Sequence, residues 1–228
     1  MNRLGVIQSV INRKDNVKYL EIGVNDGRVF LKVKAHRKIA VDPMFQIPRA
    51  DKLRYGLRNP TNIRNRYFKM TSNTFFENHA DALKKGIDVA FIDGLHTHEQ
   101  SFCDVVNCLG FLNPDGVIIM HDCLPPNAAA CQKANSPEEA ILLEHPGWTN
   151  EWTGDVYKAL LQLRVTRNDL DIFVVDADYG LGVIRKGAPS ESINLTMNEV
   201  KNLSFDDFYA QREKWPPKLG QHAKCIFC

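Results

Sequence analysis

Long apolar runs and a strong net charge are both missing from this sequence. No stretch approaches the ~20 apolar residues that a membrane-spanning helix needs. The N-terminus lacks the charged and then apolar profile of a secretory signal peptide. The net charge is only +2 over 228 residues, and no basic stripe with interleaved aromatic residues indicates nucleic-acid binding. We therefore expect a cytoplasmic protein that has neither a nucleic acid nor a membrane as a partner.

The cysteines do not form a disulfide framework or a complete zinc motif. Four of them, Cys103, Cys108, Cys123 and Cys131, are scattered, and in a cytosolic chain we expect reduced thiols. Cys225 and Cys228 form a C-x-x-C pair, but a zinc site in one chain would need a second pair. The last four residues loosely fit a prenylation box, although a flexible tail is the favoured interpretation.

Both common glycine-rich phosphate loops are also absent. The pattern G-x-G-x-x-G is not met, because the first turn has only Gly23 and Gly27. The pattern G-x-x-x-x-G-K-[ST] fails because Arg28 and Val29 follow Gly27. A reductase that uses a nicotinamide dinucleotide is therefore disfavoured.

Strand-like and helix-like patterns alternate along the chain, which predicts an α/β protein with a parallel sheet covered on both faces. The last two strands are joined too closely for a helical crossover, so they must be antiparallel. We expect a Rossmann-like, doubly wound, seven-stranded, mostly parallel sheet with one antiparallel strand. The expected strands are 17–22, 38–42, 67–70, 88–93, 117–120, 171–175 and 183–185, and the expected helices are 27–36, 98–112, 155–163 and 205–215.

Three further segments receive their own predictions. Residues 48–66 are basic and marked by prolines, and we expect a loop there. Residues 113–116 should form a turn, and 123–150 a long polar excursion that acts as a lid. Residues 1–190 are predicted to form one domain, and 191–228 its C-terminal helical extension and tail.

Polar residues stand at the carboxyl ends of five expected strands. Ligands of open α/β sheets bind at this edge, near the switch in strand order. The residues are Glu21, Gly23, Asp42, Thr71, Ser72, Asp93, His96, His98, His121 and Asp122. Their number exceeds what helix capping requires, so the edge is the expected binding site.

The stretch 19–27, Tyr-Leu-Glu-Ile-Gly-Val-Asn-Asp-Gly, is a strand that ends in a glycine-marked turn. Glycine tolerates positive φ and allows a ligand to approach the backbone closely. Asn25 in the middle of the turn is the residue type other than glycine that best tolerates the left-handed region. A carboxylate beside the turn favours a cation or a sugar hydroxyl as ligand over a phosphate. An ordinary strand–turn–helix with capping glycines would leave the same pattern.

The spacing E-x-G-x-x-x-G of this turn resembles motif I of the class I S-adenosylmethionine (SAM) methyltransferases. Two later segments, Phe91–Glu99 and Gly116–Asp122, resemble the I-D-G-x-H-x-Y-E and G-G-V-I-x-x-H-D segments of one branch of that family. The branch contains catechol O-methyltransferase-like enzymes and metal-dependent sugar O-methyltransferases. The resemblance covers roughly 17–125 and extends loosely through Trp152–Val156 and Asp178–Gly182. His98 replaces the usual Tyr, Asp115 replaces the first Gly, and His121 stands where some sugar enzymes have Glu.

The resemblance implies a cofactor site for SAM. The implied cofactor-binding residues are Glu21, Gly23, Asn25, Gly27, Asp42, Ser72 and Asp93. Asp42 is expected to accept hydrogen bonds from both ribose hydroxyls, although an Asp-Pro turn would need no ligand. Thr71 and Ser72 would lie near the adenine.

A divalent metal is a second expected ligand. Asp93 and Asp122 follow strands that should be neighbours, about 4.8 Å apart. Close carboxylates repel each other unless a cation or a proton lies between them. A Mg²⁺ or Mn²⁺ ion could therefore bind there, and His121 as a further ligand would favour manganese, iron or zinc over magnesium. The alternative is that Asp93 binds the cofactor and Asp122 caps a loop, with no metal.

His96 is the predicted general base, and Asp93 the predicted second catalytic residue through the metal. The unperturbed pKa of histidine, near 6.5, suits proton transfer at neutral pH. A loop histidine that caps the next helix is the alternative, and His98 fits that alternative better. The predicted reaction moves a methyl group from SAM to a hydroxyl of a small molecule such as a sugar unit. A metal-independent or N-directed methyltransferase, or a SAM-binding module without catalysis, remains open, as does a homo-oligomer.

Overall fold

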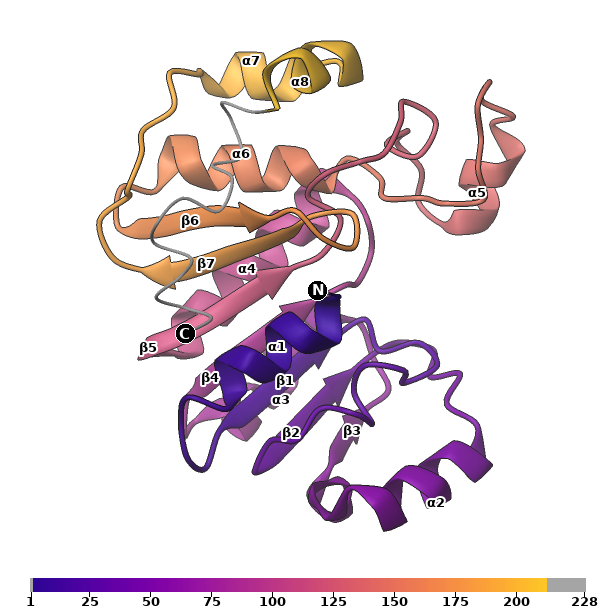
Figure 1. Ribbon diagram of the computed structural model, residues 1–228, viewed down its shortest axis with the longest axis vertical. Helices are drawn as coiled ribbons and strands as arrows, with labels where there is room; N and C mark the ends of the chain where they lie inside the picture. Colours follow the sequence, from indigo (N-terminus) through magenta and orange to yellow (C-terminus); the bar gives the residue numbers. More distant parts are fainter. Residues whose placement is uncertain (1, 213–228) are drawn as a thin grey trace. The chain divides into compact units, whose positions relative to one another are not determined.

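The computed structural model describes residues 2–212, which contain a seven-stranded sheet of order β3-β2-β1-β4-β5-β7-β6 (Figure 1). The strands are β1 (Lys18–Ile22), β2 (Arg37–Val41), β3 (Arg66–Phe68), β4 (Ile87–Ile92), β5 (Leu112–Met120), β6 (Leu170–Val175) and β7 (Leu181–Lys186). β1 pairs in parallel with β2 and β4, and β2 with β3, whereas β6 and β7 are antiparallel. The predicted Rossmann-like sheet with one reversed strand is confirmed.

The chain divides into two compact units. The first comprises the residues up to Gly94 together with Asp104–Ile119, and the second comprises Leu95–Cys103 together with the chain from Met120 onward. The helices of the first unit are α1 (Arg3–Ile11), α2 (Arg49–Arg58) and α3 (Ser72–His79), with the 3-10 helices η1 (Pro60–Arg64) and η2 (Ala80–Leu83). α1 was not predicted. It buries Val6, Ile7, Val10 and Ile11.

The helix predicted for 27–36 is absent, and this segment forms turns. The hydrogen bonds from Leu31 N to Gly27 O and from Val33 N to Val29 O are helical in type, but the pattern stops there. Side chains from later in the chain take the carbonyl groups that a helix would need. Lys38 Nζ donates to Phe30 O and Val33 O, and Asn59 Nδ2 donates to Leu31 O and Val33 O. These donors compete with a helical ladder.

The loop predicted for 48–66 is also wrong, because this segment forms α2 and η1. Pro48 is the N-cap of α2, and Pro60 begins η1. The prolines therefore bound the helices and do not interrupt them, as expected for proline in the first turn. Between them, arginine, lysine and leucine are good helix formers.

β5 begins at Leu112, so the turn predicted for 113–116 is extended chain. Asn113 Nδ2 donates to Asp88 Oδ1 at 2.6 Å, and Lys14 Nζ donates to Asp115 O at 2.6 Å. These two bonds hold the start of the strand in place. Local turn propensity is therefore overridden by tertiary contacts.

α4 (His98–Phe111) runs through the division of the chain, and the second unit further contains α5 (Pro137–Leu142), α6 (Val156–Thr166), α7 (Met197–Asn202) and α8 (Phe205–Gln211). Tyr157 and Leu161 of α6 pack with Val200, Leu203 and Phe208, which attaches the C-terminal helices to this unit. α8 lies within the predicted helix 205–215, whose end at Trp215 is outside the described residues, as are the tail and Cys225 and Cys228.

The state of the cysteines and the lengths of the helices bear on two further expectations. The four described cysteines are free thiols, as predicted. Among residues 2–212, no helix has both the length and the apolar character that crossing a membrane would require.

Candidate functional site

The glycine-marked turn after β1 has the backbone conformation that the sequence predicts. Gly23, Asn25 and Gly27 have φ values of 79°, 47° and 77°. A Cβ at Gly23 would lie 1.9 Å from the carbonyl oxygen of Asp93, which no side chain could avoid. Gly23 therefore allows the turn to pass directly over the end of β4. Because glycine has no Cβ, a ligand could approach the backbone of this turn closely at Gly23 and Gly27.

The Asp42 carboxylate fixes this turn. Its Oδ2 accepts hydrogen bonds from Val24 N at 2.7 Å and Asn25 N at 2.8 Å, and its Oδ1 accepts one from Met44 N at 2.6 Å. A carboxylate has about four acceptor positions. Three of them serve the backbone, so the geometry accommodates one ribose hydroxyl more readily than the two that were predicted.

Glu21 lies in the core beneath the turn, where its side chain is 1% exposed. The Tyr19 hydroxyl donates to Glu21 Oε2. Burial raises the pKa of Glu21 to about 8; the hydrogen bond from Tyr19 and the charge of Lys38 oppose the rise, and the charge of Asp93 adds to it. Burial likewise lowers the pKa of Lys38 to about 7, against the attraction of Glu21. Glu21 is therefore placed to support the turn from below.

These two shifts make stability depend on pH. The folded chain holds the Glu21 proton more tightly than the unfolded chain, whose pKa is near 4.5, so this stabilisation is lost as the pH rises through about 8. The lowered pKa of Lys38 has the opposite sign, since its destabilising effect is present below about pH 7 and fades as the pH rises further. Of these two groups, only Glu21 contributes a slope from pH 5 to 7.

We expect Glu21→Gln to remove this slope. Between about pH 5 and pH 7, the free energy of unfolding of the wild type should fall by a few kcal/mol relative to that of the variant. Urea denaturation at several pH values measures the difference, with the exposed Glu77→Gln as the control. Parallel pH profiles for wild type and Glu21→Gln would show that Glu21 is ionised in the folded chain.

Asp93 follows β4 by one residue, and its partner is a residue that the sequence analysis missed. Arg3 Nη1, near the start of α1, donates to Asp93 Oδ2 at 2.7 Å. The pair is partly buried, with side-chain exposures of 27% and 16%. The N-terminal helix thus supplies a positive charge to a predicted cofactor and metal ligand. Nothing in the sequence near Asp93 indicates this contact, because 90 residues separate the partners.

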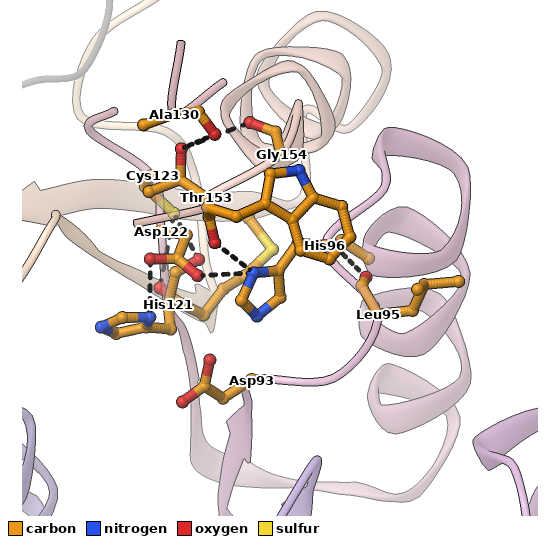
Figure 2. Close-up of polar contacts among 12 residues, drawn as sticks. Asp93, Leu95, His96, His121, Asp122, Cys123, Ala130, Thr153 and Gly154 are labelled. Atoms are coloured by element: carbon orange, nitrogen blue, oxygen red, sulfur yellow. Dashed lines mark hydrogen bonds and ion pairs between the residues drawn. The ribbon is translucent and has the colours of Figure 1, made fainter. Parts of the chain in front are cut away.

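In the second unit, His96 is held by a carbonyl oxygen and a carboxylate (Figure 2). Its Nδ1 lies 2.8 Å from the backbone oxygen of Trp152 and 3.3 Å from Asp122 Oδ2. A carbonyl oxygen can only accept, so Nδ1 carries the hydrogen and Nε2 carries the lone pair of the neutral ring. Asp122 adds a negative charge that stabilises the imidazolium form. The contacts of Nδ1 therefore place the lone pair of the neutral His96 ring on Nε2.

The loop that carries Trp152 packs tightly on His96. The two rings have centroids 5.2 Å apart, and a Cβ at Gly154 would lie 1.7 Å from the His96 carbonyl oxygen. Thr153 N and Gly154 N both donate to Ala130 O. We call residues 152–154 the His96 clamp. The pattern Trp-x-Gly is visible in the sequence, but nothing local connects it to His96.

His121 and Asp122 lie side by side at the end of β5. His121 Nδ1 is 2.8 Å from Asp122 Oδ1, and His121 Nε2 is 3.8 Å from Asp178 Oδ1. The φ of Asp122 is 61°, a strained value for a residue other than glycine. Asp178 belongs to the loose extension of the resemblance, which assigned it no role, and its contact with His121 was not predicted.

His98 and Thr71 have capping roles. The His98 backbone N donates to Asp155 Oδ1 at 2.6 Å, and the ring lies 2.6 Å from Gln162 Oε1. Asp155 thus satisfies a donor at the start of α4, where a negative charge is favourable. Thr71 caps α3, and Ser72 is buried in the first turn of that helix. A cofactor contact of Ser72 stays a prediction.

With this geometry in place, comparison with known families gives one match. Residues 20–123 match the family model described as a methyltransferase domain. The matched segment covers just under half of the chain and is similar to a methyltransferase domain. It contains the glycine-marked turn, Asp42, Asp93, His96, His121 and Asp122. None of the curated proteins compared with the chain is a significant match.

Solved structures agree with this assignment at the level of the fold. A methyltransferase from Podospora anserina bound to S-adenosylhomocysteine (SAH) has a TM-score of 0.53 at 17% identity, over 79% of this chain and 76% of its own. The O-methyltransferase TomG from Streptomyces achromogenes, in complex with SAM, gives 0.55 at 10%, over 81% and 79%. An O-methyltransferase from Bacillus cereus with SAH gives 0.52 at 13%, over 80% and 78%. The fold is that of class I SAM-dependent methyltransferases, as the resemblance implies.

Proposed function

We propose that this methyltransferase transfers a methyl group from SAM to a hydroxyl of a small molecule. The observation that carries the proposal is the arrangement of His96, whose Nδ1–H is held by the Trp152 carbonyl and by Asp122. This leaves Nε2 as the basic nitrogen, which is what a hydroxyl nucleophile requires. The two neighbours TomG and the Bacillus cereus protein are both described as O-methyltransferases, which supports the same reaction class. A sugar unit is the proposed acceptor on resemblance alone.

The cofactor would be held by the first unit. SAM would supply a methyl group bound to a positively charged sulfur, and the carbon of this methyl group is the electrophile. Gly23, Asn25 and Gly27 allow the turn to approach it, and Asp42 would accept a hydrogen bond from the ribose. Glu21 would position this turn from the core without touching the cofactor, since it is buried beneath it. Ser72 and Asp93 complete the proposed set.

His96 would act on the acceptor. Nε2 would take the proton of the hydroxyl as the oxygen forms a bond to the methyl carbon, the carbon–sulfur bond of SAM breaks and SAH leaves. The proton would remain on the imidazolium that forms. Asp122 stabilises this cation and, with the Trp152 carbonyl, keeps the ring in one orientation. A positioned base of this kind contributes about 10²–10⁴-fold to the rate. Holding both reactants in line contributes the rest of the acceleration.

We further propose a divalent ion at Asp93, His121 and Asp122. Ligand atoms of an octahedral ion at about 2.1 Å lie roughly 3 Å from one another. The spacing of 2.8 Å between His121 Nδ1 and Asp122 Oδ1 fits this requirement. β4 and β5 are neighbours in the sheet, and Asp93 follows the first as Asp122 follows the second. When bound, the ion would lower the pKa of an acceptor hydroxyl.

Metal-independent transfer is the second candidate, and the Arg3–Asp93 ion pair favours it. The guanidinium already supplies a positive charge to one oxygen of Asp93, and a metal would have to share or displace this contact. In this case Asp93 would serve the cofactor, and Asp122 would serve His96 alone.

Titration calorimetry with SAH tests the cofactor site. We expect binding by the wild type and at least a tenfold weaker affinity in Asp42→Asn, because an amide NH₂ would face the donors of Val24 and Asn25. Asp115→Asn, at a side chain that is 89% exposed, is the matched control. A wild type that ignores SAH at millimolar concentration contradicts the proposed function. Repeating the titration with Mn²⁺ separates the two candidates, since only the metal-assisted enzyme gives heat that Asp122→Asn removes.

A further inference from the structure

The small net charge of the chain conceals one strongly basic segment. Residues 49–69, here called the basic segment, contain seven Lys or Arg and one acidic residue, Asp51, which gives +6 in a chain of net +2. All seven cations are exposed: Arg49, Lys52, Arg54, Arg58, Arg64, Arg66 and Lys69. The rest of the chain is therefore acidic on balance, and the cations of this segment are not spread over the molecule.

The same segment exposes large apolar side chains. Leu53, Leu57 and Ile63 are 69%, 80% and 81% exposed, and α2 buries no residue. Leu53 and Leu57 are one helical turn apart, so they share a face. Asp51 and Tyr55, on the opposite face, are partly buried, as is Gly56 beside that face. The apolar stripe of α2 therefore points away from the first unit, between Lys52 on one side and Arg54 on the other.

α2 is attached to the first unit through polar contacts at its end, not through an apolar face. Asn59 is buried and donates to Leu31 O and Val33 O, and Asn62 donates to Leu31 O and Tyr55 O. Lys38 Nζ donates to the Asn62 side chain. Figure 1 shows α2 beyond β3, at the outer edge of this unit. A ten-residue helix is only marginally stable by itself. Because the apolar face of α2 points outward, it does not gain stability from packing on the core, and a partner outside this unit would explain it.

We propose that the basic segment docks on an anionic lipid surface. A helix with an exposed apolar stripe and flanking cations is typical of helices that lie in the membrane interface. Each basic residue near such a surface contributes about fivefold to binding, and three apolar side chains reach the boundary with the acyl chains. A second copy of the chain is disfavoured, because a two-fold interface would place +6 against +6. Docking of this kind is peripheral, reversible and sensitive to salt, and it needs no spanning helix.

Sedimentation of the full-length protein with vesicles tests this inference, which does not depend on the proposed methyl transfer. We expect binding to vesicles of phosphatidylcholine with phosphatidylglycerol and none to phosphatidylcholine alone. Reversing three charges in Arg54→Glu, Arg58→Glu, Arg64→Glu should weaken binding about 100-fold or more. The matched control Arg13→Glu, Lys84→Glu, Lys85→Glu has the same net charge and alters exposed cations outside the segment. It should lose less than threefold.

Leu53→Ser with Leu57→Ser tests the apolar contribution. This variant should bind less tightly than the wild type at every salt concentration, because it removes burial and leaves the charge unchanged. If the triple reversal fails to fold, the three arginines are changed to glutamine instead. Vesicle binding by this variant is then compared with that by the wild type under conditions in which both are equally stable. Equal losses in the two triple variants, absence of binding to anionic vesicles, or a dimer that the test variant alone dissociates would each overturn the proposal.

Discussion

Replacing His96 with glutamine should lower the rate of methyl transfer by about 10²–10⁴-fold and leave SAH affinity within twofold of the wild type. Glutamine can still donate to the Trp152 carbonyl, but it has no lone pair that takes a proton at neutral pH. The measurement is the initial rate of SAH release, with acceptors chosen from a panel of catechols and sugars. The pH profile adds a second readout, since the rise of the wild-type rate as the imidazole deprotonates should disappear in the variant.

A histidine outside the site serves as the control for this prediction. His145 lies in the long excursion, and its Nδ1 contacts only the neighbouring carbonyl of Pro146 among the hydrogen bonds recorded for the described residues. His145→Gln should keep the wild-type rate and pH profile. Retention of both by His96→Gln would exclude His96 as the base and leave positioning of the reactants as the source of catalysis.

The second large effect is expected at Gly23. Alanine there would place Cβ 1.9 Å from a carbonyl oxygen at a φ of +79°, so both the backbone and the end of β4 would have to move. We expect Gly23→Ala to lower the free energy of unfolding by about 3 kcal/mol or more and to abolish detectable SAH binding. Urea denaturation and calorimetry measure the two effects separately.

Gly110→Ala is the matched control, at a glycine with neither a positive φ nor a close contact. Gly110 lies in α4, and an added Cβ would meet nothing within 4 Å. Alanine is preferred over glycine inside helices, so this variant should be more stable by up to about 1 kcal/mol. A Gly23→Ala protein as stable as the wild type would mean that the turn is not held against Asp93.

Most strands and the polar residues at their ends could be predicted because both follow from local patterns. Apolar runs that end in a glycine or an acidic residue identify β1, β2 and β4, and the apolar run before His121 identifies the second half of β5. His121 and Asp122 are adjacent in the sequence, so their proximity in the structure needs no tertiary information. The capping role of Thr71 follows from its residue type and the helix after it.

What the sequence did not predict depends on contacts between distant residues. The turns at 27–36 form because Lys38, Asn59 and Asn62 take their carbonyl groups. The Arg3–Asp93 pair joins positions that no local pattern relates, and Asp178 reaches His121 from the connection between β6 and β7. Residues 48–66 were expected to form a loop because Pro48 and Pro60 were interpreted as helix breakers, whereas they stand at the starts of α2 and η1.

The His96 clamp has a consequence for attempts to redesign this protein. The carbonyl that determines the tautomer of His96 comes from Trp152, just after the excursion predicted to act as a lid. Exchanging that excursion for a foreign loop would also disturb the acceptor that keeps the hydrogen on Nδ1. A chimera should therefore retain residues 152–154 of the original chain if the His96 ring is to keep its tautomer.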